Sequence, residues 1–232
     1  MPSIQRIGVV IPAFNEEHSI GLVIKSIPPL VDEIVVVNNG STDRTAEAAI
    51  QSGATVLHEP RRGYGYACLK GIDHLLNRRA TIIVFLDGDF SDYPEDLPDL
   101  LSPILEGKVD FVIGSRMIGE REPGAMLPQA IIGNWLASML IRLFWGYRFT
   151  DLGPFRAIRA DALRQMNMSD PTYGWTVEMQ IKAAKLTLNC SEVPVRYRKR
   201  IGRSKVTGTL AGTIKASAKI LYTIFKHVFI KV

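Results

Sequence analysis

The sequence has few cysteines and no long apolar run. Cys68 and Cys190 are the only cysteines among 232 residues, too few for a disulfide framework or a thiolate zinc site. No uncharged apolar stretch reaches the ~18 residues that a membrane-spanning helix requires. The first residues lack the basic start, the apolar stretch and the cleavage site of a signal peptide. These absences predict a cytoplasmic protein whose chain does not cross a membrane.

Acidic residues are absent from one end of the chain. Residues 193–232 contain no Asp or Glu but ten Lys and Arg, whereas residues 1–192 hold 18 basic and 23 acidic groups. The net charge of +5 therefore combines an acidic body with a strongly basic segment. This asymmetry predicts an anionic partner near the C-terminal segment.

The rest of the composition, 47% hydrophobic and 22% charged, is typical of a globular protein and excludes disordered and collagen-like chains. Over the first 115 residues, short β-branched apolar runs alternate with amphipathic stretches. This alternation predicts an α/β fold with a mostly parallel sheet covered by helices on both faces. The predicted strands are 6–11, 33–37, 54–57, 81–86 and 109–113, and the predicted helices are 17–27, 43–51, 64–76 and 94–105.

The alternation stops after residue 115. Residues 130–145 predict a helix that is apolar nearly all round, with one narrow polar stripe of Asn134, Ser138 and Arg142. For this helix we favour a buried position or a dimer interface over the alternative, contact with a membrane. Further along the chain, a helix is predicted over 175–184 and a strand over 188–197.

The last predicted element is an amphipathic helix over 209–230. Lys215, Lys219 and Lys226 share one face at 100° per residue. The lysines could meet anionic headgroups while the apolar face touches lipid. Alternatively, the apolar face packs on the body or on a second subunit and leaves the lysines in solvent.

The most informative motif is residues 85–89 (FLDGD), a strand that ends in Asp87 and Asp89. Ligands of open α/β sheets bind beyond the carboxyl ends of the strands. Two adjacent carboxylates repel each other unless a cation lies between them, and oxygen ligands suit Mg²⁺ or Mn²⁺ shared with substrate phosphates. The alternative is two loop residues ahead of the helix that Pro94 begins. The position after a strand favours a metal–phosphate site.

Two other strands end in polar clusters on the same predicted edge, residues 12–17 (PAFNEE) and 38–43 (NNGSTD). Each cluster is also typical of a turn and a helix N-cap. Phe14 could stack on a nucleobase or pack in the core, and Asn39 could pair with a base edge or support its turn. Residues 61–67 (RRGYGYA) add two arginines and a glycine-rich helix entry, which suits anion binding.

Together these motifs resemble the family 2 glycosyltransferases with the GT-A fold. The matching segments, in order, are VVIPAFNEE (9–17), IVVVNNGSTDRT (34–45), RRGYGYA (61–67), FLDGD (85–89) and IGSR (113–116). Three later segments are most similar to dolichyl- or polyprenyl-phosphate hexose (mannose or glucose) synthases: DLGPFRA (151–157), EMQIKA (178–183) and EVPVRYRKRIGRSK (192–205). The resemblance implies a nucleotide-sugar donor of the UDP-glucose or GDP-mannose type, a polyprenyl-phosphate acceptor and Mg²⁺ or Mn²⁺ as cofactor.

The resemblance also implies roles for single residues. The nucleotide would lie among Pro12, Phe14, Glu16, Asn39 and Asp87. Asp87 and Asp89 would hold the metal on the donor diphosphate, and donor or acceptor phosphates would contact Arg116, Arg156, Arg200, Ser204 and Lys205. Asn38 and Asn39 stand where the family often has an Asp pair, which leaves the base preference open. Ser91 stands where some lipid-phosphate mannose synthases have a further metal ligand, Gln.

The expected mechanism follows from charge. A phosphate acceptor is largely dianionic at neutral pH, because its second pKa is ~6, and needs no general base. We therefore expect direct displacement with inversion, in which the metal on Asp87 and Asp89 and the basic residues Arg116, Arg200 and Lys205 stabilise the leaving diphosphate. A soluble or lipid hydroxyl acceptor would need a carboxylate base, first Glu178 and then Asp151. Glu178 is equally well explained as a helix residue paired with a basic side chain.

The expected organisation is a catalytic domain over 1–205 and an amphipathic helix over 206–232. Within the catalytic domain, 1–115 would form the nucleotide-sugar half and 116–205 the acceptor half. Arg196, Arg198 and Arg200 alternate along an extended stretch and could face one anion together. We expect the protein to lie peripherally on the cytoplasmic face of the membrane. A homodimer is a further expected association. Nucleic acid is not an expected partner, because the basic segment has few interleaved aromatics and no nucleic-acid motif.

Overall fold

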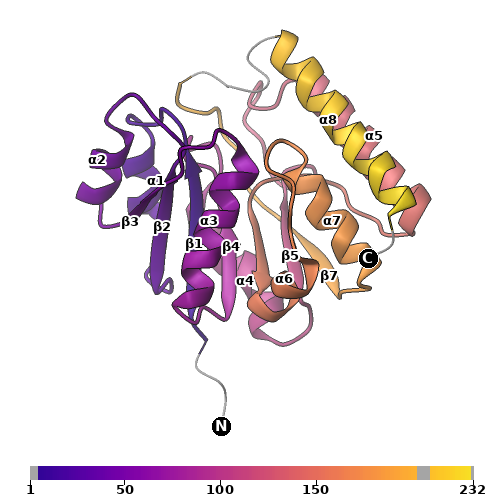
Figure 1. Cartoon of the computed structure of the whole chain (residues 1–232), viewed down its shortest axis with the longest axis horizontal. Coiled ribbons are helices and arrows are strands. Elements are labelled where there is room, and N and C mark those ends of the chain that lie inside the picture. The colour runs from indigo at the N-terminus through magenta and orange to yellow at the C-terminus, as the bar shows by residue number, and fades with distance from the viewer. Residues whose placement is uncertain (1–4, 203–209, 231–232) are drawn as a thin grey trace.

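A seven-stranded sheet forms the centre of the molecule (Figure 1). The computed structural model describes residues 5–202 and 210–230. The strand order is β3-β2-β1-β4-β6-β5-β7, and within the described residues every neighbouring pair is parallel except those made by β6. The strands are β1 (Ile7–Ala13), β2 (Glu33–Asn38), β3 (Thr55–His58), β4 (Ile82–Phe85), β5 (Phe111–Ser115), β6 (Arg156–Arg159) and β7 (Cys190–Pro194).

Helices cover both faces of the sheet, as the alternating pattern predicts. Successive residues of β1 belong to different cores: Val9 and Ile11 pack toward α1 and α4, whereas Val10 packs toward α3. The first helices are α1 (Ile20–Ser26), α2 (Thr45–Gln51), α3 (Tyr64–Asn77), η1 (Pro94–Asp96) and α4 (Leu97–Leu105). The later helices are α5 (Pro128–Trp145), α6 (Ala160–Met166), α7 (Trp175–Lys185) and α8 (Leu210–Phe229). The predicted α/β class is confirmed.

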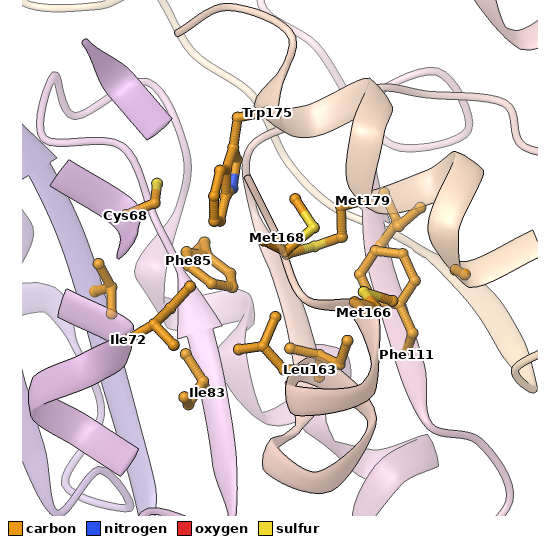
Figure 2. Close-up of a cluster of buried hydrophobic side chains, with 14 of the residues drawn as sticks. Cys68, Ile72, Ile83, Phe85, Phe111, Leu163, Met166, Met168, Trp175 and Met179 are labelled. Carbon is orange, nitrogen blue, oxygen red and sulfur yellow. The ribbon is translucent and has the colours of Figure 1, made fainter. Parts of the chain in front are cut away.

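The core on the α3 side joins the two halves of the chain. Figure 2 shows Phe85 of β4 between α3 residues such as Cys68 and the methionines that follow α6 and lie on α7. The rings of Phe85 and Trp175 meet edge to face, with centroids 6.1 Å apart. This apolar contact fixes the end of β4, where Asp87 begins the polar loop, against the start of α7.

The sequence did not predict β6 and α6. β6 runs antiparallel between β4 and β5, with Ala157 opposite Val84 and Val112. It is four residues long and carries two arginines, so its hydrophobic pattern is too short to indicate a buried strand. The sheet therefore continues across residue 115 without a break.

α5 has the opposite orientation to the one its pattern suggests. The polar residues Asn134 and Ser138 face the body, while Ile132, Trp135 and Leu143 are exposed. The Asn134 amide donates to the Thr150 carbonyl oxygen at 2.8 Å and accepts from the Leu152 N–H at 2.7 Å. The expectation that this helix is buried is thus wrong within the chain, because two backbone hydrogen bonds draw the polar stripe inward.

α8 lies along α5 and against α7 (Figure 1). Thr223, Ile224 and His227 are buried, whereas Phe225 and Phe229 are exposed. The apolar side chains of α8 therefore divide between the body and solvent instead of occupying one face. No helix within residues 5–202 and 210–230 is both long and apolar enough to span a bilayer.

The close contact between α3 and β1 leads to a testable prediction about packing. A Cβ on Gly71 of α3 would lie 2.5 Å from Cγ1 of Val10 in β1. We expect Gly71→Ala to lower the free energy of unfolding by about 1–3 kcal/mol in urea denaturation, because the added methyl group would overlap the branched Val10 side chain, which has little rotamer freedom.

The matched control is Gly133→Ala on α5, where a Cβ would meet nothing within 4 Å. Its unfolding free energy should stay equal or rise by up to about 1 kcal/mol, since alanine has the higher helix propensity. Equal stability of both variants would contradict the close approach of α3 to β1.

Candidate active site

Polar residues at the carboxyl ends of β1, β2 and β4 surround a cleft of about 470 Å³. Three elements distant in sequence reach this edge because parallel strands end on the same side of the sheet. The residues that the sequence assigned to the nucleotide and the metal all line the cleft: Pro12, Phe14, Glu16, Asn39, Asp87 and Asp89. Their contacts with a nucleotide stay a prediction, but their convergence is as expected. We call this space the first cleft.

Asp87 and Asp89 bring two carboxylates together beyond β4. Asp89 is 4% exposed and accepts from the Ser91 N–H at 2.9 Å and from the Arg200 guanidinium at 2.9 Å. Asp87 accepts from the Tyr64 hydroxyl at 3.2 Å. Burial and the charge of Asp89 raise the pKa of Asp87 to about 7, although Arg200 acts in the opposite direction.

A third carboxyl group, that of Asp92, lies at the same edge of the sheet. It is buried, and neither of its oxygens has a hydrogen-bond partner in the described part of the chain. Burial and the charge of Asp87 raise its pKa well above the ordinary value. Oxygen donors that are crowded and incompletely neutralised fit a hard divalent cation. Within residues 5–202 and 210–230, however, no three His, Cys, Asp or Glu side chains are placed to hold a metal ion together, so the assignment of Asp87 and Asp89 to the metal stays a prediction.

The Arg200 guanidinium forms an ion pair with Asp89. Besides Asp89, its guanidinium lies 3.6 Å from a Glu16 carboxylate oxygen. Its Nε atom is buried and has no hydrogen-bond partner among the described residues. Arg200 therefore retains a donor at the inner end of the cleft.

The two preceding arginines do not point to the same place. Arg196 donates to Asp96 at 2.8 Å. Arg198 stacks on Phe90 and Tyr93, 3.4 and 4.0 Å from the ring centroids, and donates to the Phe90 carbonyl oxygen at 2.7 Å. The prediction that all three arginines face one anion is wrong, because Arg196 and Arg198 fasten the loop that follows β4.

A second cleft of about 600 Å³ adjoins the first and shares Tyr64, Asp87, Tyr173 and Arg200 with it. Its other walls come from α5, α8 and the loop before α5, and they include the side chains Met126, Leu127 and Ile220. The two clefts therefore meet at Asp87 and Arg200. The first cleft also holds the Asp89 carboxylate, and the second is lined by apolar side chains of α8 and of the loop before α5.

Arg116 lines the second cleft and is held by Asp151. The two side chains form a bidentate ion pair, with distances of 2.8 and 2.7 Å, and the Arg116 N–H also donates to Asp151. Burial would raise the pKa of Asp151, but Arg116 keeps it below the ordinary value. Asp151 thus positions Arg116 and is poorly suited to take a proton from an acceptor.

Glu178 does not occur among the described residues that line either cleft. Its buried carboxylate accepts from Lys182 at 2.9 Å, from the Ser169 hydroxyl at 2.7 Å and from the Asp170 N–H at 2.7 Å. These donors keep its pKa below the ordinary value despite burial. The structure corrects its assignment as a catalytic base, and its pairing with a basic side chain is the better interpretation.

Arg156 also lies away from the clefts. It is buried, and it donates to the carbonyl oxygens of Gly153 and Thr176 at 3.0 Å and of Leu152 at 3.1 Å. Its assignment to a phosphate is therefore corrected, because its donors support the loop beneath the second cleft. Ser204 and Lys205, the remaining predicted phosphate contacts, lie outside the described residues.

Asn39 supports a loop instead of presenting its amide to the cleft. Its Nδ2 donates to the Glu59 and Arg61 carbonyl oxygens at 3.0 and 2.7 Å, and its Oδ1 accepts from the Gly63 N–H at 2.8 Å. The loop places the Arg62 guanidinium 3.8 Å from the centroid of the Phe14 ring. Of the two interpretations of Asn39, support of its turn describes these contacts.

Some residues of the clefts were not singled out in the sequence. Arg62 and Tyr64 belong to the RRGYGYA segment, so the motif was visible but not their individual positions. Tyr173, which lines both clefts, lies in a turn without a recognisable motif. Asp92 follows FLDGD closely, and only its burial distinguishes it from a loop residue.

The loop at 59–63 predicts a pH-dependent contribution to stability. The Glu59 carboxylate accepts from the Arg61 N–H and guanidinium, each at 2.9 Å, and these bonds hold the pKa of Glu59 at about 2. A depressed pKa stabilises the fold above the ordinary value of 4.5, and this stabilisation is lost as pH falls toward 2. We expect Glu59→Gln to be less stable than wild type at pH 6, with a smaller difference at pH 3.

Urea denaturation at both pH values measures this difference. The control is Glu120→Gln, which removes an exposed carboxylate elsewhere on the surface. A difference between wild type and Glu59→Gln that is unchanged from pH 6 to pH 3 would refute the role of the Glu59–Arg61 pair.

The sequence and the fold are similar to those of known proteins. Residues 8–166 match the profile of glycosyl transferase family 2. Undecaprenyl-phosphate mannosyltransferase of Micrococcus luteus is 32% identical over 224 residues, which cover 89% of this chain and 90% of that protein. The low-salt glycan biosynthesis hexosyltransferase Agl6 of Haloferax volcanii is 32% identical over 86% of this chain, which spans only 49% of the length of that relative.

Solved structures agree with the sequence relatives. Glucosyl-3-phosphoglycerate synthase from Mycobacterium tuberculosis, in complex with Mn²⁺, uridine diphosphate and glucosyl-3-phosphoglycerate, superposes with a TM-score of 0.75 at 27% identity. The match covers 97% of this chain and 81% of that one. Another structure of the same enzyme contains Mg²⁺ and uridine diphosphate. The profile match, the relatives and the shared architecture lead to one conclusion: the chain belongs to glycosyltransferase family 2 and has the GT-A fold.

Proposed function

We propose that the protein is a metal-dependent, inverting hexosyltransferase that moves a hexose from a nucleotide-sugar to a polyprenyl phosphate. The observation that carries this proposal is the meeting of two unlike clefts at Asp87 and Arg200. The first cleft suits a nucleotide diphosphate, and the second is lined by Arg116 and Arg200 together with apolar side chains from α8 and the loop before α5. A phosphate joined to a hydrocarbon tail has the same two characters.

Asp87 and Asp89 are the residues that would hold Mg²⁺ or Mn²⁺. The two carboxylates are crowded beside Asp92, and Arg200 pairs with Asp89. A bound divalent ion would neutralise their mutual repulsion more fully than this arginine does. The metals in the structures of glucosyl-3-phosphoglycerate synthase support the same choice. When bound, the metal would neutralise charge on the diphosphate leaving group.

The occupied carboxylates favour a phosphate acceptor over a hydroxyl. Asp151 is paired with Arg116 and Glu178 is enclosed by donors, so neither is available as a base. A phosphate oxygen can attack the anomeric carbon without losing a proton, while the bond from that carbon to the diphosphate oxygen breaks. Arg116 and Arg200, which both line the second cleft, would hold the attacking phosphate.

The outer surface beside the second cleft suits a lipid bilayer. α5 and α8 expose large apolar residues and carry exposed cations, including Arg142, Lys215 and Lys226. The sequence has no Asp or Glu between Glu122 and Asp151 or after Glu192. Each basic residue near an anionic membrane contributes ~1 kcal/mol to binding. We infer a peripheral enzyme on the cytoplasmic membrane face, with α5 and α8 toward the lipid.

Sugar transfer by the purified chain tests the reaction. With Mn²⁺ and a panel containing UDP-glucose and GDP-mannose, one donor should give a lipid-linked hexose from undecaprenyl phosphate. Arg200→Ala should lower kcat by about 10²–10³ because it removes a charged donor from the transition state. The control is Arg159→Ala, which should retain wild-type kcat, because Arg159 lies at the end of β6 that is away from the clefts.

The acceptor is decided in the same assay. 3-Phosphoglycerate is tested as the soluble acceptor because the structurally similar glucosyl-3-phosphoglycerate synthase was solved in complex with phosphoglyceric acid. We expect it to accept no sugar. Transfer to 3-phosphoglycerate alone would replace the lipid acceptor by a soluble one. Absence of transfer from every donor to either acceptor would contradict the proposed function.

Vesicle flotation tests the membrane surface. The wild-type chain should float with vesicles that contain phosphatidylglycerol, and Trp135→Glu with Leu143→Glu should reduce the bound fraction about tenfold, since buried apolar area and charge drive binding. The control is Ile50→Glu on α2, because Ile50 is as exposed as Trp135, at 61%. A dimer in solution that the double variant disrupts would instead assign this face to a second subunit.

A further inference from the structure

The loop at 169–174 forms a wall that both clefts share. Thr172 and Tyr173 line the first cleft, and Tyr173 also lines the second. The loop connects the end of the α6 region to α7, and the Trp175 N–H donates to the Thr172 carbonyl oxygen at 3.3 Å. The shape of both clefts therefore depends on what holds this loop.

Two of its supports come from the catalytic body. The Tyr66 N–H at the start of α3 donates to the Pro171 carbonyl oxygen at 3.1 Å. From α7, Glu178 accepts from the Ser169 hydroxyl and the Asp170 N–H, each at 2.7 Å. These bonds anchor the base of the loop and leave the Asp170 carboxylate for a third support.

The third support is α8. The Lys219 ammonium lies 2.7 Å from Oδ2 of Asp170, whose side chain is 7% exposed, while that of Lys219 is 28% exposed. Oδ1 of Asp170 accepts from the Thr172 N–H at 2.8 Å. One carboxylate thus ties the turn that carries Thr172 to a helix that lies outside the sheet.

Gly174 brings the loop and α8 into close contact. A Cβ at this position would lie 2.4 Å from Oδ2 of Asp170 and 2.5 Å from Oγ1 of the buried Thr223 on α8. No side chain larger than hydrogen fits between the helix and the loop without moving one of them. The helix and the loop are packed as one unit at this point.

We propose that Lys219 is a positioning residue of the active site, through which α8 fixes the loop at 169–174 and so sets the shape of both clefts. The assignment of the clefts to donor and acceptor rests on the proposed function. The contact itself separates Lys219 from its helical neighbours: Lys215 and Lys226 are exposed, whereas Lys219 turns toward the body. The amphipathic pattern placed all three lysines on one face and did not distinguish them.

Tryptophan fluorescence tests the proposal without any substrate. In a Trp135→Phe, Trp145→Phe background, Trp175 is the sole tryptophan and directly follows the loop. Lys219→Met keeps the aliphatic stem but removes the charge, so acrylamide quenching of Trp175 should increase about threefold or more. Lys219→Arg should restore wild-type quenching, and Lys215→Met and Lys226→Met should not change it.

Nucleotide binding provides a second measurement. With Mn²⁺, calorimetry of UDP and GDP should show about a tenfold higher Kd for Lys219→Met than for wild type, which corresponds to the loss of one charge-assisted hydrogen bond. Gly174→Ala, which separates the helix from the loop while keeping Lys219, should give the same two changes.

Wild-type quenching in both Lys219→Met and Gly174→Ala would overturn the proposal. If Lys219→Met fails to fold, Gly174→Ala and Lys219→Arg still decide the matter. The quenching experiment uses neither sugar nor lipid, so its result is independent of whether the chain transfers a hexose to polyprenyl phosphate.

Discussion

Asp87 and Asp89 follow the same buried strand, and their carboxylates must coexist with the buried Asp92 at the edge of the sheet that lines the clefts. Like charges at such a place are unfavourable unless cations neutralise them. The rest of the site is arranged around this requirement: Arg200 pairs with Asp89, and residues 198–201 run along the loop after β4. The remaining negative charge makes the same edge suitable for a divalent cation and a diphosphate.

Some charged residues beside the clefts hold the site in place and do not line either cleft. Arg198 is stacked and bonded to backbone carbonyls, and Asp151 is committed to Arg116. A buried ion pair contributes little net stability, but breaking one leaves an uncompensated charge, so such pairs resist rearrangement. Arg116 and Arg200 each pair with a carboxylate and also line the second cleft.

The sequence predicted the sheet and its polar edge because apolar strands and strand-end polar clusters are local patterns. It could not predict the partners of single charged residues, since Arg196 meets Asp96 across 100 positions and Glu178 meets a loop that precedes its helix. β6 was not predicted, because a short strand with two arginines has no distinctive hydrophobic pattern. Helical periodicity located the stripe of Asn134 and Ser138, but only the backbone groups at Thr150 and Leu152 decide that this stripe faces inward.

The inward stripe of α5 has a consequence for the whole molecule. Because Asn134 is held by the body, Trp135 and Leu143 must face outward, where exposed apolar surface costs about 25 cal/mol per Å² relative to burial. Phe144 of α5 meets Phe225 of α8 edge to face, with centroids 6.0 Å apart, so both helices contribute to this surface. A molecule that covers this surface therefore contacts α8. The same helix carries Lys219, which is paired with Asp170 in the loop between the two clefts.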